Sequence, residues 1–352
     1  MITIEPVATE RHRDEFVGLP GRLHRRGSYE PALATERRLL SGTHPLSDTL
    51  TLRCWTATSG AGTTGRIGLT AYPDDPTTGY VGFLEAADPG TAAALFDTAA
   101  EAAAAQGRSR LVGPVNGSFW LRYRLKVSGF DERPYFGEPL NPPEHVRLWE
   151  AAGFAETDHY RSAFYRRPDE ATAADRFSAR EELFARRGFE IRAPRPDEWD
   201  RLLRDLYDLL TELYATLPAY RPIGFEAFRG LYGPMRAIAD FSMVRMAYRE
   251  GRAEGFLVAF PDYGLGLASD STARRVAALL RHRRRSDRYV LLYLGVRHPG
   301  LGSALMRSFG AEIVRRRAEL VGALTHVTKA SGGYAADLIR HRNDYLLLAR
   351  DL

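Results

Sequence analysis

The chain has 352 residues, of which 44% are hydrophobic and 26% charged, proportions typical of a folded globular protein and not of a disordered or collagen-like one. Its length favours two domains over one. The 49 basic and 44 acidic residues give a net charge of +5, which permits an anionic ligand but is too small to indicate a nucleic-acid partner.

Targeting and redox features are sparse. No stretch reaches the roughly 18 consecutive apolar residues of a membrane-spanning helix. The first five residues predict a strand and lack the features of a secretory signal. Cys54 is the only cysteine, so we expect it to be buried, reduced and without a disulfide. We therefore expect a cytoplasmic protein without a membrane partner.

The first part of the chain, to about residue 167, alternates strand and helix patterns. The predicted elements are strands over 2–7, 49–58, 66–72, 79–85 and 110–112, helical material over 11–40 and an alanine-rich helix over 91–105. Gly113-Pro114 then interrupts the pattern.

A similar order of elements follows a polar, alanine-rich linker near residues 168–178, which leads into a helix. The predicted elements are strands over 189–192, 241–248, 255–260, 289–296, 322–327 and 345–348, and helices over 196–213, 224–237, 271–285, 303–317 and 334–342. The strand over 289–296 is continuously apolar, which indicates burial on both faces. We expect a mixed α/β sheet.

The junction after this buried strand is the most informative segment. Residues 295–303 read Gly-Val-Arg-His-Pro-Gly-Leu-Gly-Ser and lead directly into a helix. Such a turn directs unpaired backbone N–H groups and the positive end of the helix dipole at one point, where a phosphate or diphosphate can bind. The alternative is an ordinary strand-to-helix turn.

Arg297-x-x-Gly300-x-Gly302 resembles the Q/R-x-x-G-x-G/A signature of the GCN5-related N-acetyltransferase (GNAT) superfamily. The resemblance implies two tandem GNAT-like domains, each a mixed, mostly antiparallel twisted sheet flanked by helices, over residues 1–167 and 168–352. It also implies that acetyl-CoA or another acyl-CoA is the co-substrate. The residues expected to bind it are Val296, Arg297, His298, Gly300, Leu301, Gly302, Ser303 and Ala304. The motif departs from the usual spacing because Arg297 follows Val296 directly.

Further segments resemble a bacterial group of large acetyltransferase-like proteins. They are residues 113–120, 128–134, 141–143, 149–154, 221–224 and 260–263. The first domain is a degenerate copy under this interpretation, because its corresponding loop carries Asp88 and lacks the motif. We expect it to form one wall of the acceptor cleft. Gly60-x-Gly62-x-x-Gly65 precedes a strand, so we interpret it as a hairpin loop and not as a dinucleotide site.

Candidate catalytic residues come mainly from the resemblance. His326, at the end of a strand, is a candidate general base or else an ordinary core or surface histidine. Tyr293 is a polar member of the buried strand, and Tyr334 is a candidate proton donor to the departing thiolate, although the family usually places a tyrosine where this chain has Leu338. Candidates for the acceptor pocket, or else for loop scaffolding, are Asn116, Trp120, Tyr135 and Asn141.

We expect an N-acyltransferase that acts directly on the amine of a small metabolite or amino-acid derivative. No motif indicates a metal site. The basic run over 281–285 is a solvated helix end or a contact to the 3′-phosphate of coenzyme A or to transfer RNA. The alternatives are therefore an aminoacyl-tRNA-dependent transferase of the same fold and a non-catalytic binding protein.

Overall fold

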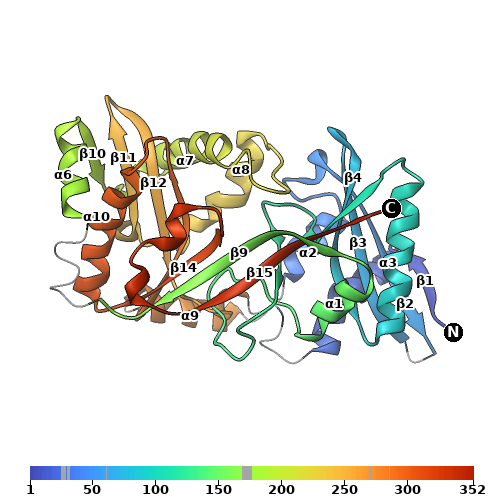
Figure 1. Cartoon of the computed structure of the whole chain (residues 1–352). Helices are drawn as coiled ribbons and strands as arrows, with labels where there is room; N and C mark the ends of the chain where they lie inside the picture. Colours follow the sequence, from blue (N-terminus) through green and yellow to red (C-terminus); the bar gives the residue numbers. More distant parts are fainter. Residues whose placement is uncertain (25–28, 30–31, 61, 169–176, 269–271, 285) are drawn as a thin grey trace.

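The computed structural model describes residues 1–24, 29, 32–60, 62–168, 177–268, 272–284 and 286–352 (Figure 1). In the first half, the helices are α1 (Glu10–Leu23), α2 (Leu33–Leu40), α3 (Pro89–Ala104) and α4 (Glu144–Ala151). The strands are β1 (Thr3–Pro6), β2 (Thr51–Ser59), β3 (Gly62–Tyr72), β4 (Asp75–Ala86), β5 (Arg110–Gly113), β6 (Val115–Asn116), β7 (Arg122–Tyr123), β8 (Leu125–Lys126) and β9 (Ala155–Tyr165).

The second half repeats the plan of strand, two helices, hairpin, strand, helix and strand. Its helices are α6 (Ser178–Arg186), α7 (Trp199–Leu213), α8 (Phe225–Tyr232), α9 (Thr272–Arg284) and α10 (Leu301–Arg316). Its strands are β10 (Phe189–Arg192), β11 (Val244–Arg249), β12 (Arg252–Pro261), β13 (Arg288–Val296), β14 (Glu319–His326) and β15 (Ile339–Asp351).

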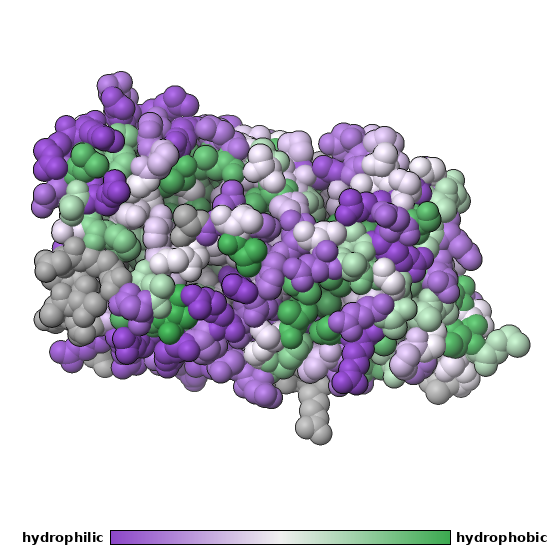
Figure 2. All heavy atoms as spheres, viewed as in Figure 1, coloured by the Kyte–Doolittle hydropathy of each residue, from purple (hydrophilic) through white to green (hydrophobic). Residues whose placement is uncertain are grey.

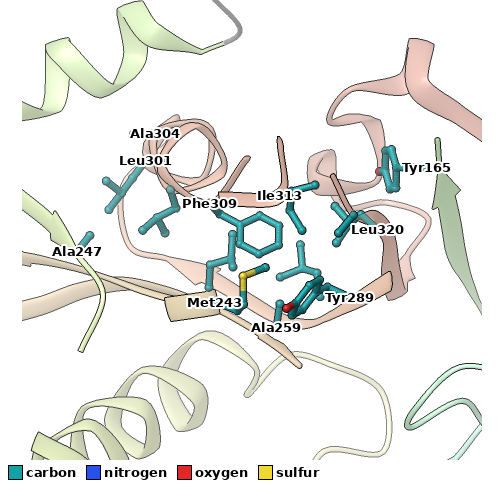
Figure 3. Packing of buried hydrophobic residues seen from close by; sticks show 14 of the residues in the cluster. Tyr165, Met243, Ala247, Ala259, Tyr289, Leu301, Ala304, Phe309, Ile313 and Leu320 are labelled. Atoms are coloured by element: carbon teal, nitrogen blue, oxygen red, sulfur yellow. The ribbon is translucent and has the colours of Figure 1, made fainter. Parts of the chain in front are cut away.

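Apolar residues at helical spacing hold α7 and α10 against the sheet. Leu202, Leu203, Leu209 and Leu210 of α7 are buried, as their spacing predicts. Figure 3 shows the same for α10, whose buried residues point toward Ala259 of β12, Tyr289 of β13 and Met243, which directly precedes β11. This core fixes the position of the N-terminus of α10 relative to β13.

Both halves share one sheet of 13 strands. Its order is β1-β2-β3-β4-β5-β15-β9-β14-β13-β12-β11-β10, with β8 beside β15. The last strand of each half is exchanged: β15 pairs with β5 of the first half, and β9 pairs with β14 of the second. In Figure 1, β9 and β15 run side by side between the halves. The predicted boundary at residue 167 falls directly after β9, so hydrogen bonding of the sheet crosses it in both directions.

β13 and β14 pair only at their beginnings and then diverge. Their parallel pairing extends from Arg288↔Glu319 to Leu291↔Gly322. Beyond these positions β13 continues along β12, whereas β14 continues along β9. The divergence opens a gap in the sheet at the carboxyl ends of the two strands.

The sequence-based predictions near the end of each half need correction. The helix predicted over 334–342 is wrong: two 3-10 turns (Ala330–Gly333 and Ala336–Leu338) lead into β15, which begins at Ile339. Pairing of β15 with β9 supplies the backbone hydrogen bonds that a helix would have made. The strand β9 and helix α4 were not predicted, because the polar start of β9 resembles a loop until both neighbouring strands are present.

The surface is mixed in character. On the face shown in Figure 2, small groups of hydrophobic residues are interspersed among hydrophilic ones. Within the described part of the chain, every helix is too short or too polar to serve as a membrane span. Cys54 is buried, as predicted, and burial raises the pKa of its thiol.

Candidate functional site

A cavity of about 1260 Å³ lies between the two halves. The diverging ends of β13 and β14 form one wall, with residues of α7 and α8 beside them, and first-half residues 116–124 form much of the opposite wall. Pockets for drug-sized ligands usually measure about 300–1,000 Å³, so this cavity has room for more than one small reactant.

The turn between β13 and α10 borders this cavity through Val296, Gly300 and Gly302. Gly300 has φ of +88°, a left-handed conformation that favours glycine over other residues. No side chain caps the N-terminus of α10. The helix therefore presents its positive dipole end at the edge of the cavity, although the N–H groups of Leu301 and Ser303 already donate to the carbonyls of His298 and Gly300.

Gly302 also has a steric role that sequence analysis did not anticipate. A Cβ atom at this position would lie 2.5 Å from the hydroxyl oxygen of Tyr334. The hydroxyl of Tyr334 therefore lies at the first turn of α10, and Tyr334 itself lines the cavity. The structure brings together Tyr334 and the predicted diphosphate loop.

Four other residues predicted to bind the coenzyme direct their side chains elsewhere. Leu301 and Ala304 are fully buried in the core (Figure 3), so only their backbone atoms are available to a ligand. Ser303 does not line the cavity. His298 faces the opposite side of the turn, with Nε2 3.1 Å from Glu254 Oε2 and its ring against Phe189.

Arg297 does not direct its guanidinium at the loop. Nε donates to both carboxylate oxygens of Glu212 at 3.0 Å, and Nη1 donates to the carbonyl of Ala253 at 2.5 Å. This pairing lowers the pKa of Glu212. Arg297 therefore bridges α7 and β12 and does not face the predicted diphosphate site. The sequence did not reveal this bridge because Glu212 lies 85 residues away.

Sequence analysis missed one cation near the loop and one that lines the cavity. Arg180 of α6 has Nη1 3.5 Å from the position of a Cβ atom at Gly300. Lys329, one of only two lysines, lines the cavity and has an exposed side chain. Both come from segments outside the glycine motif, so only the packing of α6 and the turn after β14 reveals them.

Solved structures resemble the whole chain, although no protein-family model and no curated protein sequence matches it. A tandem GNAT protein from the clavulanic acid biosynthesis pathway gives a TM-score of 0.53 at 14% identity and covers 100% of this chain and 98% of that one. The chain has the tandem GNAT fold. GCN5-related N-acetyltransferases from Anabaena variabilis (TM-score 0.51, 7% identity, 99% and 72% coverage) and Kribbella flavida (0.50, 10%, 100% and 72%) resemble it as well.

In this GNAT fold, His326 lies at the cavity end of β14. Its Nδ1 accepts the backbone N–H of Thr328 at 3.3 Å, which places the ring proton on Nε2, 3.3 Å from Asp158 Oδ1. The Thr328 hydroxyl also lies 2.8 Å from Nδ1. Nδ1 is thus the basic atom, and Thr328 must release it before it can accept a proton from a substrate.

Tyr293 faces the same cavity from β13. Its hydroxyl lies 3.4 Å from that of Tyr232. Burial raises the pKa of Tyr293. It therefore retains its proton at neutral pH and can donate a hydrogen bond but cannot act as a base.

The first half of the GNAT fold contributes two of the four predicted acceptor residues. Asn116 and Trp120 line the cavity, and the Trp120 indole N–H donates to the carbonyl of Arg221 at 2.7 Å, which joins the halves. Tyr135 is fully buried, with its hydroxyl 2.8 Å from Ser162 Oγ, and Asn141 accepts the backbone N–H of Lys126 at 2.8 Å. Neither Tyr135 nor Asn141 lines the cavity, so both are scaffold residues.

Charged residues that line the cavity are mostly cationic. Five arginines line it, whereas Glu36 is the only acid among the lining residues and pairs with Arg66 at 2.6 Å. Arg124 stacks between Tyr123 and Tyr160, with Cζ 3.7 and 4.0 Å from the two ring centroids. Its Nη2 donates to the Tyr123 hydroxyl, whereas its buried Nε has no hydrogen-bond partner.

In the first half, the turn before α3 corresponds to the loop before α10, and a side chain already caps α3 there. Asp88 caps α3, accepting the backbone N–H of Thr91 at 2.9 Å and its hydroxyl at 2.7 Å, and these bonds lower the pKa of Asp88. A carboxylate thus occupies the position of an anion. The hairpin interpretation of residues 60–65 agrees with the structure, in which β2 ends at Ser59 and pairs with β3 from Gly62 onward. Much of the basic run 281–285 lies outside the described side chains.

Proposed function

We propose that this protein is an N-acyltransferase that uses an acyl-CoA, with acetyl-CoA as the first candidate, to acylate the amine of a small molecule bound between the halves. One observation carries the proposal: the uncapped start of α10 and the gap between β13 and β14 open into the same cavity. An anionic coenzyme and an acceptor can therefore meet there. The tandem GNAT fold supports the reaction class.

The reaction that we propose joins the amine nitrogen to the thioester carbonyl carbon and breaks the carbon–sulfur bond. The amine loses a proton, and the departing thiolate gains one. His326 Nδ1 is the candidate for taking the first proton. Tyr293 and Tyr334 are candidates for supplying the second, and holding both reactants in one cavity supplies much of the rate.

We further propose that the acceptor carries an anionic group. Arg124 supports this because its partly buried guanidinium has no hydrogen-bond partner at Nε, and no ion pair to a carboxylate forms within the described part of the chain. A carboxylate on the acceptor can accept from this guanidinium. The aromatic rings around it suit an apolar or planar body on the same molecule.

Two experiments test the proposal. Calorimetric titration with acetyl-CoA and with free coenzyme A measures binding. A transfer assay on paired amines, with and without a carboxylate, measures the reaction. We expect binding of both coenzymes and release of free thiol with the carboxylate-bearing amines. Binding without transfer to any amine would favour a non-catalytic binding protein. Absence of coenzyme binding, with retention of the protein on transfer RNA, would favour an aminoacyl-tRNA-dependent transferase.

A further inference from the structure

Three metal-binding side chains from separate segments of the first half converge on one point. His24 follows the C-terminus of α1, Glu85 lies near the end of β4, and His145 lies in the first turn of α4. One ligand atom from each lies within 4.8 Å of the other two. The sequence contains no motif for this group because its members are separated by about 60 residues in the chain.

The distances fit a small ion after a minor adjustment. His24 Nε2 lies 2.6 Å and His145 Nε2 lies 3.5 Å from the same carboxylate oxygen, Glu85 Oε2. Zinc binds nitrogen and oxygen at roughly 2.0–2.1 Å in tetrahedral geometry, which separates its ligand atoms by about 3.3 Å. His145 and Glu85 therefore have the required spacing. His24, which is hydrogen-bonded to Glu85 without the ion, must give up this bond and move outward by less than 1 Å.

One buried atom in this group lacks the partner that its environment requires. His145 is 5% exposed and Glu85 is 8% exposed. Nε2 of His145 has no hydrogen-bond partner, and an unpaired polar atom in the interior is costly. A bound ion at the centre of the group would satisfy it.

The surrounding charges leave the Glu85 carboxylate available for a cation. Arg66 approaches the other oxygen of Glu85, with Nη2 3.8 Å from Oε1. Arg66 also makes a bidentate pair with Glu36, at 2.6 and 3.3 Å, so its charge is already balanced. Arg66 lies on the Oε1 side of Glu85, whereas Oε2 faces the two histidines.

We propose that His24, Glu85 and His145 bind a divalent transition-metal ion, with Zn²⁺ the best match to two imidazoles and one carboxylate. The ion joins α1, β4 and α4 of the first half. His24 is the most exposed of the three ligands and lies on the open side of the site. This site is separate from the acyltransferase proposal and does not depend on it.

The experiment uses the full-length protein, stripped with a chelator and then titrated with ZnSO₄ by calorimetry, with Co²⁺ as a spectroscopic probe. We expect one ion per chain, a higher melting temperature in the presence of zinc, and the visible absorption of tetrahedral Co²⁺. His24→Asn and His145→Asn should each weaken zinc binding by about tenfold or more. His44→Asn removes another buried histidine of the same half and should leave zinc binding unchanged.

Two results would overturn the site. One is a folded wild-type protein that takes up no zinc and shows no tetrahedral Co²⁺ spectrum. The other is a His24→Asn protein with unchanged zinc affinity. The wild-type Co²⁺ spectrum does not depend on any variant, so poor folding of His145→Asn does not prevent a decision.

Discussion

At the scale of single residues, Arg124 is the most informative side chain in the cavity. Its backbone has φ of +91°, a conformation that costs a residue other than glycine about 1–3 kcal/mol and persists only where its surroundings enforce it. Tyr123 and Tyr160 enclose its guanidinium. The fold thus holds a cation in a fixed position at the acceptor wall.

Replacing this cation should change the use of the acceptor and not that of the coenzyme. We expect Arg124→Met to raise KM for carboxylate-bearing amines about 10- to 100-fold, the equivalent of one charge-assisted hydrogen bond. The Kd for acetyl-CoA should stay unchanged, and Arg124→Lys should restore part of the loss. Steady-state kinetics on the paired amines measures this. An equal KM change for amines without a carboxylate would contradict the assignment.

His44 gives a prediction for stability against pH. Burial lowers the pKa of His44 from 6.5 to about 4 in the folded chain. As the pH falls, His44 of the unfolded chain therefore binds a proton near pH 6.5, whereas His44 of the folded chain stays neutral until about pH 4. The contribution of His44 to stability is fully present above pH 6.5 and is lost as the pH falls toward 4.

Thermal melts between pH 7 and pH 5 should consequently show a falling melting temperature. His44→Asn should flatten this decline, because the amide oxygen can accept the Leu46 N–H that Nδ1 accepts at 3.3 Å and cannot be protonated in this range. His12→Asn on α1 is the control and should keep the wild-type slope. If His44→Asn leaves the slope unchanged, protonation of His44 is not the cause of the decline in melting temperature.

At the scale of elements, the turn from β13 to α10 has both a binding and a packing role at Gly302. A single Gly302→Ala substitution would not separate the binding role from the packing role, since the new Cβ meets the Tyr334 hydroxyl. Removing that hydroxyl leaves the nearest ring atom at 3.5 Å, an ordinary contact. The Tyr334→Phe background therefore isolates the effect of a methyl group on anion binding.

We expect the Gly302→Ala/Tyr334→Phe protein to bind acetyl-CoA at least about tenfold more weakly than Tyr334→Phe alone, a loss of roughly 1.4 kcal/mol. Gly310→Ala, on the same helix with no atom within 4 Å of its new Cβ, should bind as tightly as wild type. Calorimetry provides the Kd, and circular dichroism checks the fold. Equal Kd values in the first pair would show that the diphosphate binds elsewhere.

Local pattern predicted the elements whose apolar spacing or turn residues are complete within a short segment, and failed where distant partners decide. The β13 strand, the glycine turn and α10 follow one another directly, so their sequence sufficed. β15 was misread because its partners, β5 and β9, lie far away in the chain. Arg297 was misassigned for the same reason, since nothing near it in sequence indicates Glu212.

At the scale of the whole molecule, strand exchange joins the two GNAT-like halves into one sheet. A buried network strengthens the junction: Glu138 accepts from Lys126 Nζ at 2.8 Å and from the Tyr345 hydroxyl of β15 at 2.6 Å. Residues before and after the predicted boundary therefore contribute to the same core. The similar order of elements in the two halves was predictable, but the exchange was not.

Separated halves should not fold alone. Residues 1–167 would leave β9 without β14 and β15, and residues 168–352 would leave β14 and β15 with unpaired edges. We expect each fragment to aggregate or to lack a cooperative melt, and the co-expressed pair to elute as one complex of full-length size. Size-exclusion chromatography and thermal melts decide this. A monomeric, cooperatively melting fragment would establish independent domains.

The paired ladders of β9 and β15 also limit how reactants can reach the cavity. Hinge-like opening of one half away from the other would require both ladders to break, which is far more costly than rotating a few side chains. We therefore expect reactants to enter and leave the cavity without separation of the two halves. The size of the cavity entrance should then set the largest acceptor, and a bulkier amine should be rejected whatever its charge.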